Sequence, residues 1–275
     1  MPVRTMHRSF RLVVIDVDGT LVDRNHPLSP AVRTAIARTQ AIGVRVTLAS
    51  GRMYSLLRPF IEALELRTPV ICYGGAQIVN PLTRQVLYQR GVPLDLARAV
   101  ILAARQRGLT ARVYIGERVY VEGLAPDHFN YDALVRIGAE DVGDLLAFLA
   151  EEPTHLAIDV PADRTRQIVT EMRAIFGDSL HVTTGHPLLA EFSLPDVHKG
   201  SALAWLAAHL QISPAETLAI GDDWNDLEML RQAGLGIAVA NAHPDVLAAA
   251  DATVPACRDD GVAVALERFV LRHPH

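Results

Sequence analysis

The sequence is short of several features that would reveal a function by themselves. Its 275 residues contain two cysteines, Cys72 and Cys257, which lie far apart and do not form a metal-ligand spacing. We expect both to be ordinary core residues in a reduced, cytoplasmic setting. No apolar run approaches the length of a membrane span, and no apolar stretch of a signal peptide follows the basic residues of positions 4–8. These absences argue against a membrane-spanning protein and against a cysteine-bound metal.

An excess of positive charge is also absent. The chain carries 26 basic and 31 acidic residues, for a formal net charge of -5, so we expect no surface for nucleic acid. Half of the residues are hydrophobic and 21% are charged, a globular balance that argues against disorder. The length suits one large domain or two modest ones. We therefore expect a monomer or small homo-oligomer that binds a small molecule, with neither a nucleic acid nor a membrane as partner.

A short run of β-branched and apolar residues, 12–15, ends in two carboxylates, Asp16 and Asp18. The run is typical of a strand that is buried on both faces. Positions i and i+2 of an extended chain point the same way, so both carboxylates are expected to face one site. They repel each other unless one is protonated or a cation lies between them, and Mg²⁺ would suit oxygen ligands. A plain strand followed by an Asp-Gly turn would explain the same residues.

Apolar strands and amphipathic helices alternate at both ends of the chain. This order predicts right-handed βαβ units and a parallel sheet. We therefore expect an α/β fold with a Rossmann-like core. The expected strands are 12–15, 44–49, 70–72, 217–220, 235–239 and 252–254, and the expected helices are 31–41, 53–64, 199–210, 227–233, 243–250 and 262–271.

The pattern changes between about residues 83 and 186, where hairpins and isolated helices replace the alternation. We expect residues 1–82 and 187–275 to form the core and residues 83–186 to form an inserted α+β cap. The chain crosses between them near Asn80–Pro81 and His186–Pro187, and these crossings could act as hinges. Within the insertion we expect helices at 94–107 and 162–176, extended segments at 111–115, 118–121, 155–160 and 180–184, and helix or loop at 126–137 and 142–150. A further extended segment is expected at 189–193, just beyond its end.

Polar side chains follow three of the expected core strands directly. Asp16, Ser50 and Asp222 each come just after the end of a strand. The carboxyl ends of parallel strands share one crevice in a doubly wound sheet. We therefore expect these three residues to converge, although they are far apart in the sequence.

Four segments of the chain resemble, in order, the motifs of the haloacid dehalogenase-like (HAD) superfamily. Asp16-Val17-Asp18-Gly19-Thr20-Leu21 resembles the nucleophile motif, and Ser50-Gly51-Arg52 resembles the second. Lys199-Gly200 and Gly221-Asp222-Asp223-Trp224-Asn225-Asp226 resemble the third and fourth. The spacing is most similar to that of Cof-type phosphatases, which carry a C2B-type cap between the second and third motifs. This resemblance covers essentially the whole chain and implies a HAD-like fold.

The resemblance implies a role for each motif in phosphoryl transfer. Asp16 would be the nucleophile that forms an aspartyl-phosphate. Asp18 would protonate the leaving alkoxide and later accept a proton from water, which favours phosphoester chemistry over dehalogenation. Gly19 would allow a tight turn beside the phosphate. Lys199 would neutralise Asp16 and the transferring group, whereas an ordinary reading makes it a surface lysine at the start of a helix.

The resemblance also implies a magnesium site and a phosphate cradle. Mg²⁺ would be bound by the Asp16 carboxylate, the main-chain carbonyl of Asp18 and Asp222. Asp226 would support the metal or Lys199, or would simply cap a helix. Ser50 could equally be an ordinary helix N-cap. The residues expected to contact phosphate are Val17, Ser50, Gly51, Lys199 and Asn225.

One position departs from the family pattern. Gly74 stands where Cof-type relatives usually have an asparagine, which puts one polar contact at the mouth of the site in doubt. We expect Arg52 to be a solvated residue without a catalytic role. The residues that could line a pocket for the leaving group, or could simply pack, are Tyr73, Gln77, Tyr114, Tyr120 and His128.

The sequence thus predicts a Mg²⁺-dependent phosphatase that hydrolyses small phosphorylated metabolites, such as sugar phosphates, in the cytoplasm. A phosphosugar mutase of the same superfamily remains open, because it would use the same pair of aspartates. A phosphosugar-binding regulator without catalysis is a third reading, although every residue that the chemistry needs is present.

Overall fold

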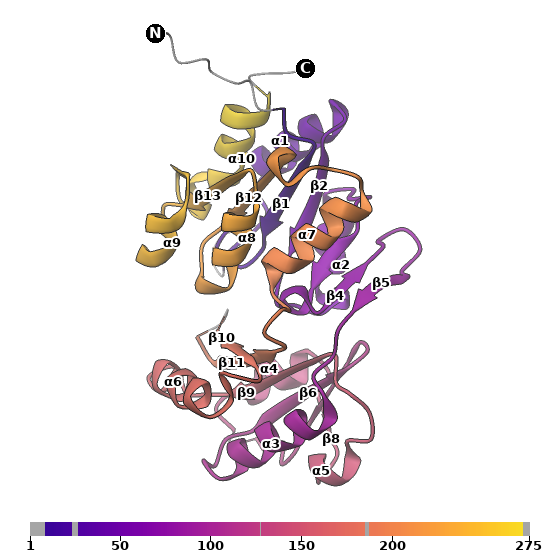
Figure 1. The fold of residues 1–275 in the computed structure, drawn as a ribbon, viewed down its shortest axis with the longest axis vertical. Coiled ribbons are helices and arrows are strands. Elements are labelled where there is room, and N and C mark those ends of the chain that lie inside the picture. The colour runs from indigo at the N-terminus through magenta and orange to yellow at the C-terminus, as the bar shows by residue number, and fades with distance from the viewer. Residues whose placement is uncertain (1–8, 24–26, 127, 185–186, 272–275) are drawn as a thin grey trace. The chain divides into compact units, whose positions relative to one another are not determined.

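The computed structural model describes residues 9–23, 27–126, 128–184 and 187–271 (Figure 1). The chain divides into two compact units. The first, which we call the core unit, consists of Met1–Leu87 and His198–His275. The second, which we call the inserted unit, is Tyr88–Val197. Both boundaries fall later than the expected positions 83 and 186.

The core unit contains an eight-stranded sheet in the order β14-β13-β12-β1-β2-β3-β4-β5. The pairs from β14 to β3 are parallel, and β4 runs antiparallel to β3. The α/β fold with a parallel core is therefore confirmed. The strands are β1 Leu12–Asp16, β2 Arg45–Ala49, β3 Val70–Cys72, β4 Gln77–Val79, β5 Val86–Gln89, β12 Thr217–Gly221, β13 Leu235–Val239 and β14 Ala252–Val254. The last two residues of β5 already belong to the inserted unit.

The strands β4 and β5 explain why the first boundary moves. Asn80 lies in the turn that joins them, where its N–H donates to the carbonyl of Gln85 and its carbonyl accepts from Arg84. The expected crossing at Asn80–Pro81 is therefore a hydrogen-bonded turn at the edge of the core sheet. His186, at the second expected crossing, lies outside the described residues.

The helices of the core unit begin where the sequence places their caps. Ser29 caps α1, because its Oγ accepts from the N–H of Val32, and Pro30 occupies the first helical position. Figure 1 shows α7 and α8 packed side by side in front of the core sheet. The helices are α1 Pro30–Ala41, α2 Tyr54–Ala63, α7 Lys199–His209, α8 Leu227–Gln232, α9 Pro244–Ala249 and α10 Gly261–Leu266, the last continued by a π-helical turn over Glu267–Leu271.

The inserted unit is an α+β lobe around a six-stranded sheet in the order β10-β11-β9-β6-β7-β8. One face of this sheet packs its apolar side chains against α3 and α6. Alternate residues of the same strands turn polar side chains to the other face. The elements are α3 Leu94–Arg105, β6 Ala111–Ile115, β7 Arg118–Val121, α4 Tyr131–Arg136, β8 Glu140–Asp141, α5 Leu145–Phe148, β9 His155–Asp159, α6 Thr165–Phe176, β10 His181–Thr183 and β11 Leu189–Ser193.

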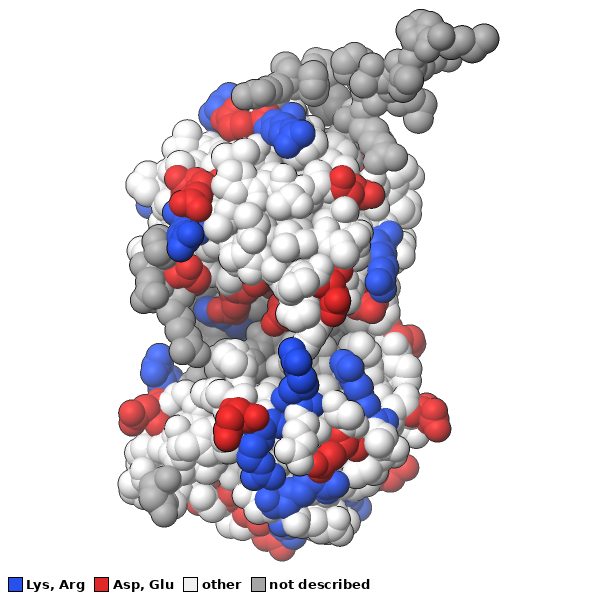
Figure 2. All heavy atoms as spheres, turned by 90° about the vertical axis from the view of Figure 1, so that its left-hand side faces the viewer, with Lys and Arg blue, Asp and Glu red and all other residues white. Residues whose placement is uncertain are grey.

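Arginine supplies the positive charge on the surface of the inserted unit. Figure 2 shows groups of basic side chains interspersed with acidic ones on the face that it draws. Arg105 pairs with Glu122 and Asp144, and Arg118 pairs with Glu140. Local pairing of this kind leaves much of the arginine charge compensated.

Candidate active site

A buried ionic cluster forms where β1 and β12 end and α7 begins. The Nζ of Lys199 lies 2.6 Å from Asp16 Oδ1, 2.7 Å from Asp226 Oδ1 and 3.4 Å from Asn225 Oδ1. Lys199 is 1% exposed, Asp16 4% and Asp226 0%. The reading of Lys199 as a surface lysine is therefore wrong, since its side chain crosses the interior to reach two carboxylates.

Lys199 is the only lysine in the sequence, in which every other Lys or Arg position is arginine. An arginine carries a planar fork, whereas the compact ammonium of a lysine can meet three oxygens that converge on one point. The amino-acid composition therefore distinguishes Lys199 independently of its motif, because it is the single lysine among many arginines. Burial by itself would lower the pKa of Lys199, but the adjacent Asp16 and Asp226 carboxylates outweigh it and raise that pKa.

Asp222 joins the cluster from the loop that follows β12. Asp16, Asp222 and Asp226 each offer one carboxylate oxygen, and these oxygens lie within 4.8 Å of one another. The hydroxyl of Thr20 donates to Asp222 Oδ1 at 2.7 Å. Gly19 adopts φ +89°, and a Cβ at this position would lie 2.2 Å from Asp222 Oδ2, so the turn requires glycine. The predicted convergence of the loops after β1 and β12 is thus observed.

The donor set suits a hard divalent cation. Both oxygens of Asp226 are already engaged, Oδ1 by Lys199 and Oδ2 by the backbone N–H groups of Asp222 and Asp223 at 3.0 and 3.1 Å. Asp16 Oδ2, in contrast, is buried and has no hydrogen-bond partner among the described residues. Oxygen ligands of this kind are those that Mg²⁺ prefers. Asp16 and Asp222 therefore fit the metal better than Asp226 does, which leaves Asp226 as a support for Lys199 and for the loop.

The electrostatics of the cluster agree with this fit. Burial, together with the charge of Asp226, raises the pKa of Asp16 well above its ordinary value, although Lys199 opposes the rise. Burial and Asp226 also raise the pKa of Asp222 to about 7. Three carboxylates around one ammonium leave an excess of negative charge, and a divalent cation would offset it.

Asp18 does not point into the buried cluster, contrary to the expectation from strand alternation. Its side chain is 47% exposed, and its two oxygens accept from Arg52, with Nε 2.8 Å from Oδ2 and Nη2 bonded to Oδ1. The strand ends at Asp16, and the carbonyl of Val17 accepts from the N–H groups of Leu21 and Val22, both at 3.0 Å. The backbone therefore turns before Asp18, and the alternation of side chains stops there. Arg52 is consequently a partner of Asp18 and is not merely solvated.

The segment Ser50-Gly51-Arg52 is anchored at the end of β2. Ser50 is buried, and its Oγ accepts from the N–H of Arg52 at 3.2 Å. The N-cap of α2 is Met53, so the reading of Ser50 as that helix's cap is wrong. Gly74 donates its N–H to the carbonyl of Ser50 at 2.9 Å. Gly74 has φ +62°, a conformation that asparagine also tolerates, and a Cβ there would meet nothing within 4 Å.

The other predicted contacts have mixed outcomes. Val17 is buried, and Asn225 reaches Lys199. The phosphate contacts expected of Val17, Ser50, Gly51, Lys199 and Asn225 all remain predictions. Tyr120 belongs to the apolar core of the inserted unit and lies with its ring 4.5 Å from that of Phe148, which favours packing. The remaining pocket candidates divide between the units, with buried Tyr73 and Gln77 in the core unit, and Tyr114 (buried) and His128 (stacked on Phe129) in the inserted unit.

Asn241 is a site residue that the sequence reading missed. Its Nδ2 donates to the carbonyl of Gly19 at 2.8 Å, and its Oδ1 accepts from the N–H of Cys257 at 2.7 Å. It therefore ties the turn after β1 to two other loops. No local pattern marks it, because its partners lie far away in the sequence.

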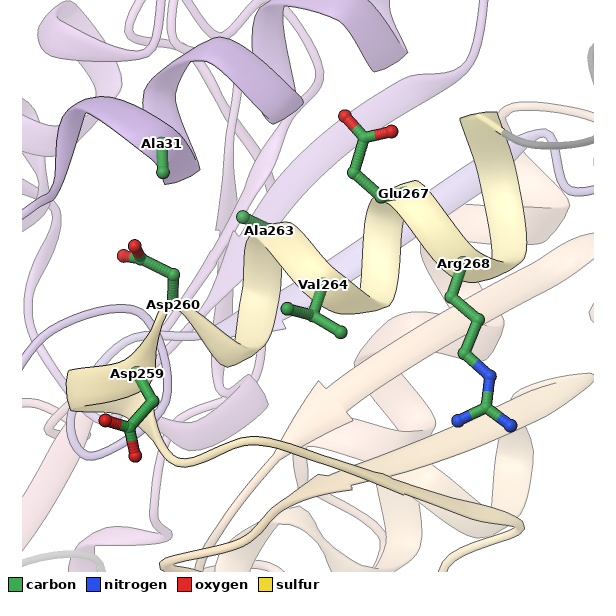
Figure 3. Close-up of a pocket in the computed structure, with 7 residues that line it drawn as sticks. All are labelled: Ala31, Asp259, Asp260, Ala263, Val264, Glu267 and Arg268. Carbon is green, nitrogen blue, oxygen red and sulfur yellow. The ribbon is translucent and has the colours of Figure 1, made fainter.

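A hollow on the core unit lies away from this cluster (Figure 3). It has a volume of about 450 Å³ and opens between α1 and α10. Its lining does not include any residue of the buried cluster. The lining residues are Ala31, Asp259, Asp260, Ala263, Val264, Glu267 and Arg268.

The parallel sheet with acidic side chains and one lysine at its strand ends has the arrangement of a haloacid dehalogenase-like hydrolase. Residues 13–266 match that family, and the chain belongs to it. It is a phosphatase of the Cof type, as its relatives indicate. Among the described residues, no helix is both long and apolar enough to cross a membrane.

Three relatives illustrate the match. The HMP-PP phosphatase of Cronobacter sakazakii is 27% identical over 267 residues, which cover 96% of this chain and 97% of that protein. A solved haloacid dehalogenase-like hydrolase from Bacteroides thetaiotaomicron is 28% identical with a TM-score of 0.81, covering 94% of this chain and 99% of that one. BT1666, a phosphatase of the same superfamily from that organism, is 26% identical with a TM-score of 0.81, covering 98% of both chains.

Proposed function

We propose that this phosphatase is Mg²⁺-dependent and hydrolyses small phosphomonoesters, such as sugar phosphates, through an aspartyl-phosphate on Asp16. The observation that carries the proposal is the buried cluster in which Lys199 binds Asp16 and Asp226 beside Asp222. The cluster combines a fixed carboxylate, a cation and a further pair of acidic oxygens. Such a group can hold a phosphoryl group and stabilise the charge that develops during its transfer.

The first half of the reaction transfers the phosphoryl group to the protein. Lys199 holds Asp16 Oδ1 and so fixes the plane of the nucleophilic carboxylate. A carboxylate oxygen of Asp16 forms a bond to phosphorus while the bond from phosphorus to the leaving oxygen breaks. Asp18 gives its proton to that oxygen, so the product leaves as an alcohol.

The second half restores the enzyme. Water attacks the phosphorus of the aspartyl-phosphate, Asp18 accepts a proton from it, and the bond between Asp16 and phosphorus breaks to release inorganic phosphate. Mg²⁺ bound by Asp16, Asp222 and the Asp18 carbonyl would polarise the phosphoryl group and offset its charge. Lys199 remains paired with Asp226, which keeps the ammonium directed at the phosphoryl group.

We assign the discrimination among substrates to the inserted unit. The core cluster can contact only the phosphoryl group, which every phosphomonoester shares, so discrimination depends on contacts with the leaving group. The HMP-PP phosphatase relative is named for a small phosphorylated molecule, which supports small phosphorylated metabolites as the class of substrate.

The test is a screen of phosphorylated metabolites with the purified protein, in Mg²⁺ and in excess chelator, with Asp16→Asn as control. We expect Mg²⁺-dependent release of inorganic phosphate from a subset of the panel. A mutase would convert one sugar phosphate into another without net release. A binding regulator would do neither, although it would still be stabilised by its ligand.

A further inference from the structure

Arg52 makes a two-pronged ion pair with Asp18 at the exposed edge of the cluster. Its Nε and Nη2 donate to different oxygens of the same carboxylate, so the contact fixes both the position of Asp18 and the plane of its carboxylate. The side chains of Arg52 and Asp18 are 31% and 47% exposed. An exposed carboxylate on a turn would otherwise be free to change rotamer.

Arg52 is itself held from three directions. Its N–H donates to Ser50 Oγ at 3.2 Å, and its carbonyl accepts from the N–H of Tyr73 at 3.1 Å. Its guanidinium lies 5.3 Å from the ring centroid of Phe60 on α2. A cation over an aromatic face is attracted to it, so the side chain has a preferred direction as well as a fixed backbone. Arg52 is thus a firm support for Asp18.

The position of Asp18 matches the path of a leaving group. Asp16 is buried, and an in-line displacement places the leaving oxygen on the far side of phosphorus from the attacking carboxylate. The leaving oxygen must therefore point outward, toward the exposed edge where Asp18 lies. The three carboxylates of the cluster would repel a fourth that moved inward, whereas Arg52 attracts Asp18 to the edge.

We propose that Arg52 is the positioning residue of Asp18, holding it at the outer edge of the site where the leaving group departs. This inference rests on the proposed function, because it needs Asp18 to be the group that exchanges a proton with the leaving oxygen and with water. To donate, Asp18 must carry a proton on one oxygen and give up one prong of the Arg52 pair, while the other prong keeps the carboxyl group at the edge. It assigns Arg52 no contact with the phosphoryl group. It predicts that the loss of Arg52 matters in proportion to how strongly a leaving group needs a proton.

The experiment uses a series of substituted phenyl phosphates, from p-nitrophenyl phosphate, whose leaving group departs readily, to unsubstituted phenyl phosphate. Arg52→Met keeps the bulk over Phe60 and removes the fork. We expect kcat for phenyl phosphate to fall by about 10- to 100-fold, a part of the roughly 10²- to 10⁴-fold that general acid catalysis contributes, and kcat for p-nitrophenyl phosphate to change by less than about threefold. The kcat of Arg52→Lys for phenyl phosphate should lie between those of the wild type and Arg52→Met, because one ammonium cannot reproduce the fork.

Two controls separate positioning from folding. Arg58→Met removes an exposed arginine on α2 that pairs with Glu62, and its leaving-group dependence should equal that of the wild type. In the Asp18→Asn background, adding Arg52→Met should change kcat for phenyl phosphate by less than about twofold, because the two residues act as one unit. Equal melting temperatures of wild type and Arg52→Met would show that the fold is kept.

The kinetic results test the positioning role of Arg52 separately from the proton-transfer role of Asp18. An equal loss on both substrates, an additive loss in the double variant, or no loss on phenyl phosphate would overturn the positioning role of Arg52. If Asp18→Asn itself fails to steepen the leaving-group dependence, the proton-transfer role in the proposed function is wrong, and the inference about Arg52 fails with it. If Asp18→Asn steepens it and Arg52→Met does not, only the inference fails.

Discussion

The two units of this protein each bury an ionic cluster, and the two clusters differ in charge balance. In the inserted unit, Arg112 donates through Nε to Asp159 Oδ2 at 2.8 Å and through Nη2 to Oδ1, and Asn130 donates to Oδ1 at 2.7 Å. One cation meets one anion there. In the core unit, one ammonium faces three carboxylates, those of Asp16, Asp222 and Asp226, and Asp16 Oδ2 has no partner among the described residues.

This difference in charge balance distinguishes an ion pair that stabilises the fold from a cluster that is suited to bind a charged ligand. Burial by itself would lower the pKa of Arg112, but the hydrogen bond to Asp159, the charge of Asp159 and the interactions with Tyr114 together outweigh it and raise that pKa, so the buried cation is compensated within the inserted unit. In the core unit, burial and neighbouring carboxylates raise the pKa of Asp16 and Asp222. A buried cluster with unbalanced charge is costly unless a ligand supplies the missing charge. Charge imbalance therefore supports the proposal that the core cluster receives a cation and a phosphoryl group.

The largest effect on activity is expected from Asp16→Asn. Without the nucleophile, kcat should fall by about 10⁴-fold or more, as in other enzymes that lose a covalent nucleophile. Because the change also removes a negative charge from an overcharged cluster, the melting temperature should not fall. Phosphate release, trapping by beryllium fluoride and calorimetry provide the measurements. Release at the wild-type rate would contradict the assignment of the nucleophile.

Replacing the only lysine should damage both activity and stability. Lys199→Met leaves two buried carboxylates without their cation, which should cost about 3–5 kcal/mol of unfolding free energy, as for other broken buried pairs. Activity should fall by about 10³-fold, because the transferring phosphoryl group loses a preorganised charge. Urea unfolding and steady-state kinetics measure the two effects. Asp16→Asn added to Lys199→Met should recover part of the lost stability, and no recovery would argue against the coupling described here.

Much of this site follows from sequence because topology places it. The ends of parallel strands bring Asp16 and Asp222 together whatever lies between them, and the family resemblance adds Lys199. The partner of Asp18 could not be predicted, since strand alternation stops at Asp16 and the backbone turn beyond it depends on hydrogen bonds to Val17. Arg52 meets Asp18 only through the packing of the second loop against the first.

The antiparallel strand β4 near the edge of the core sheet could not be predicted from the sequence either. The strand β4, Gln77–Val79, has three residues and follows β3 after a short 3₁₀ turn over Tyr73–Gly75, so its pattern is too short to distinguish from a loop. Its pairing with β3 extends the core sheet and moves the boundary of the inserted unit to Tyr88. The α+β class of the inserted unit was accessible because long helices, such as α3 and α6, have clear amphipathic patterns.

Removal of the metal should affect the core unit through Asp222. We expect chelation to abolish activity and Mg²⁺ to restore it, and we expect Mg²⁺ to raise the melting temperature of the wild type, because a ligand that binds only the folded state stabilises it. In Asp222→Ala both responses should shift to higher Mg²⁺ concentration. The indole of Trp224 lies two residues along the same loop and offers a fluorescence signal for binding without turnover. Full activity in excess chelator would exclude the metal.

Loss of the balanced Arg112–Asp159 pair should lower the stability of the protein without changing its response to Mg²⁺. Arg112→Met should lower the unfolding free energy by about 3–5 kcal/mol, because Asp159 would be left as a buried charge. Arg112→Met combined with Asp159→Leu should recover most of that loss, since apolar replacements of a buried pair are often tolerated. The Mg²⁺ dependence of the melting temperature should be the same as in the wild type. If the single variant is as stable as the wild type, the pair does not stabilise the inserted unit.

The smallest expected effect is a pH dependence of stability that only the unbalanced cluster produces. Folding raises the pKa of Asp16, and raises that of Asp222 to about 7, whereas both would titrate near pH 4 in the unfolded chain. Between about pH 4 and 7 the folded state therefore binds more protons than the unfolded state, so in chelator the unfolding free energy should fall as pH rises. Mg²⁺, which favours the ionised carboxylates, should flatten this slope, and Asp16→Asn should reduce it. Urea unfolding at several pH values measures the slope, and Asp259→Asn, at an exposed position, serves as the matched control. A slope that neither Mg²⁺ nor Asp16→Asn changes would show that the cluster is not overcharged.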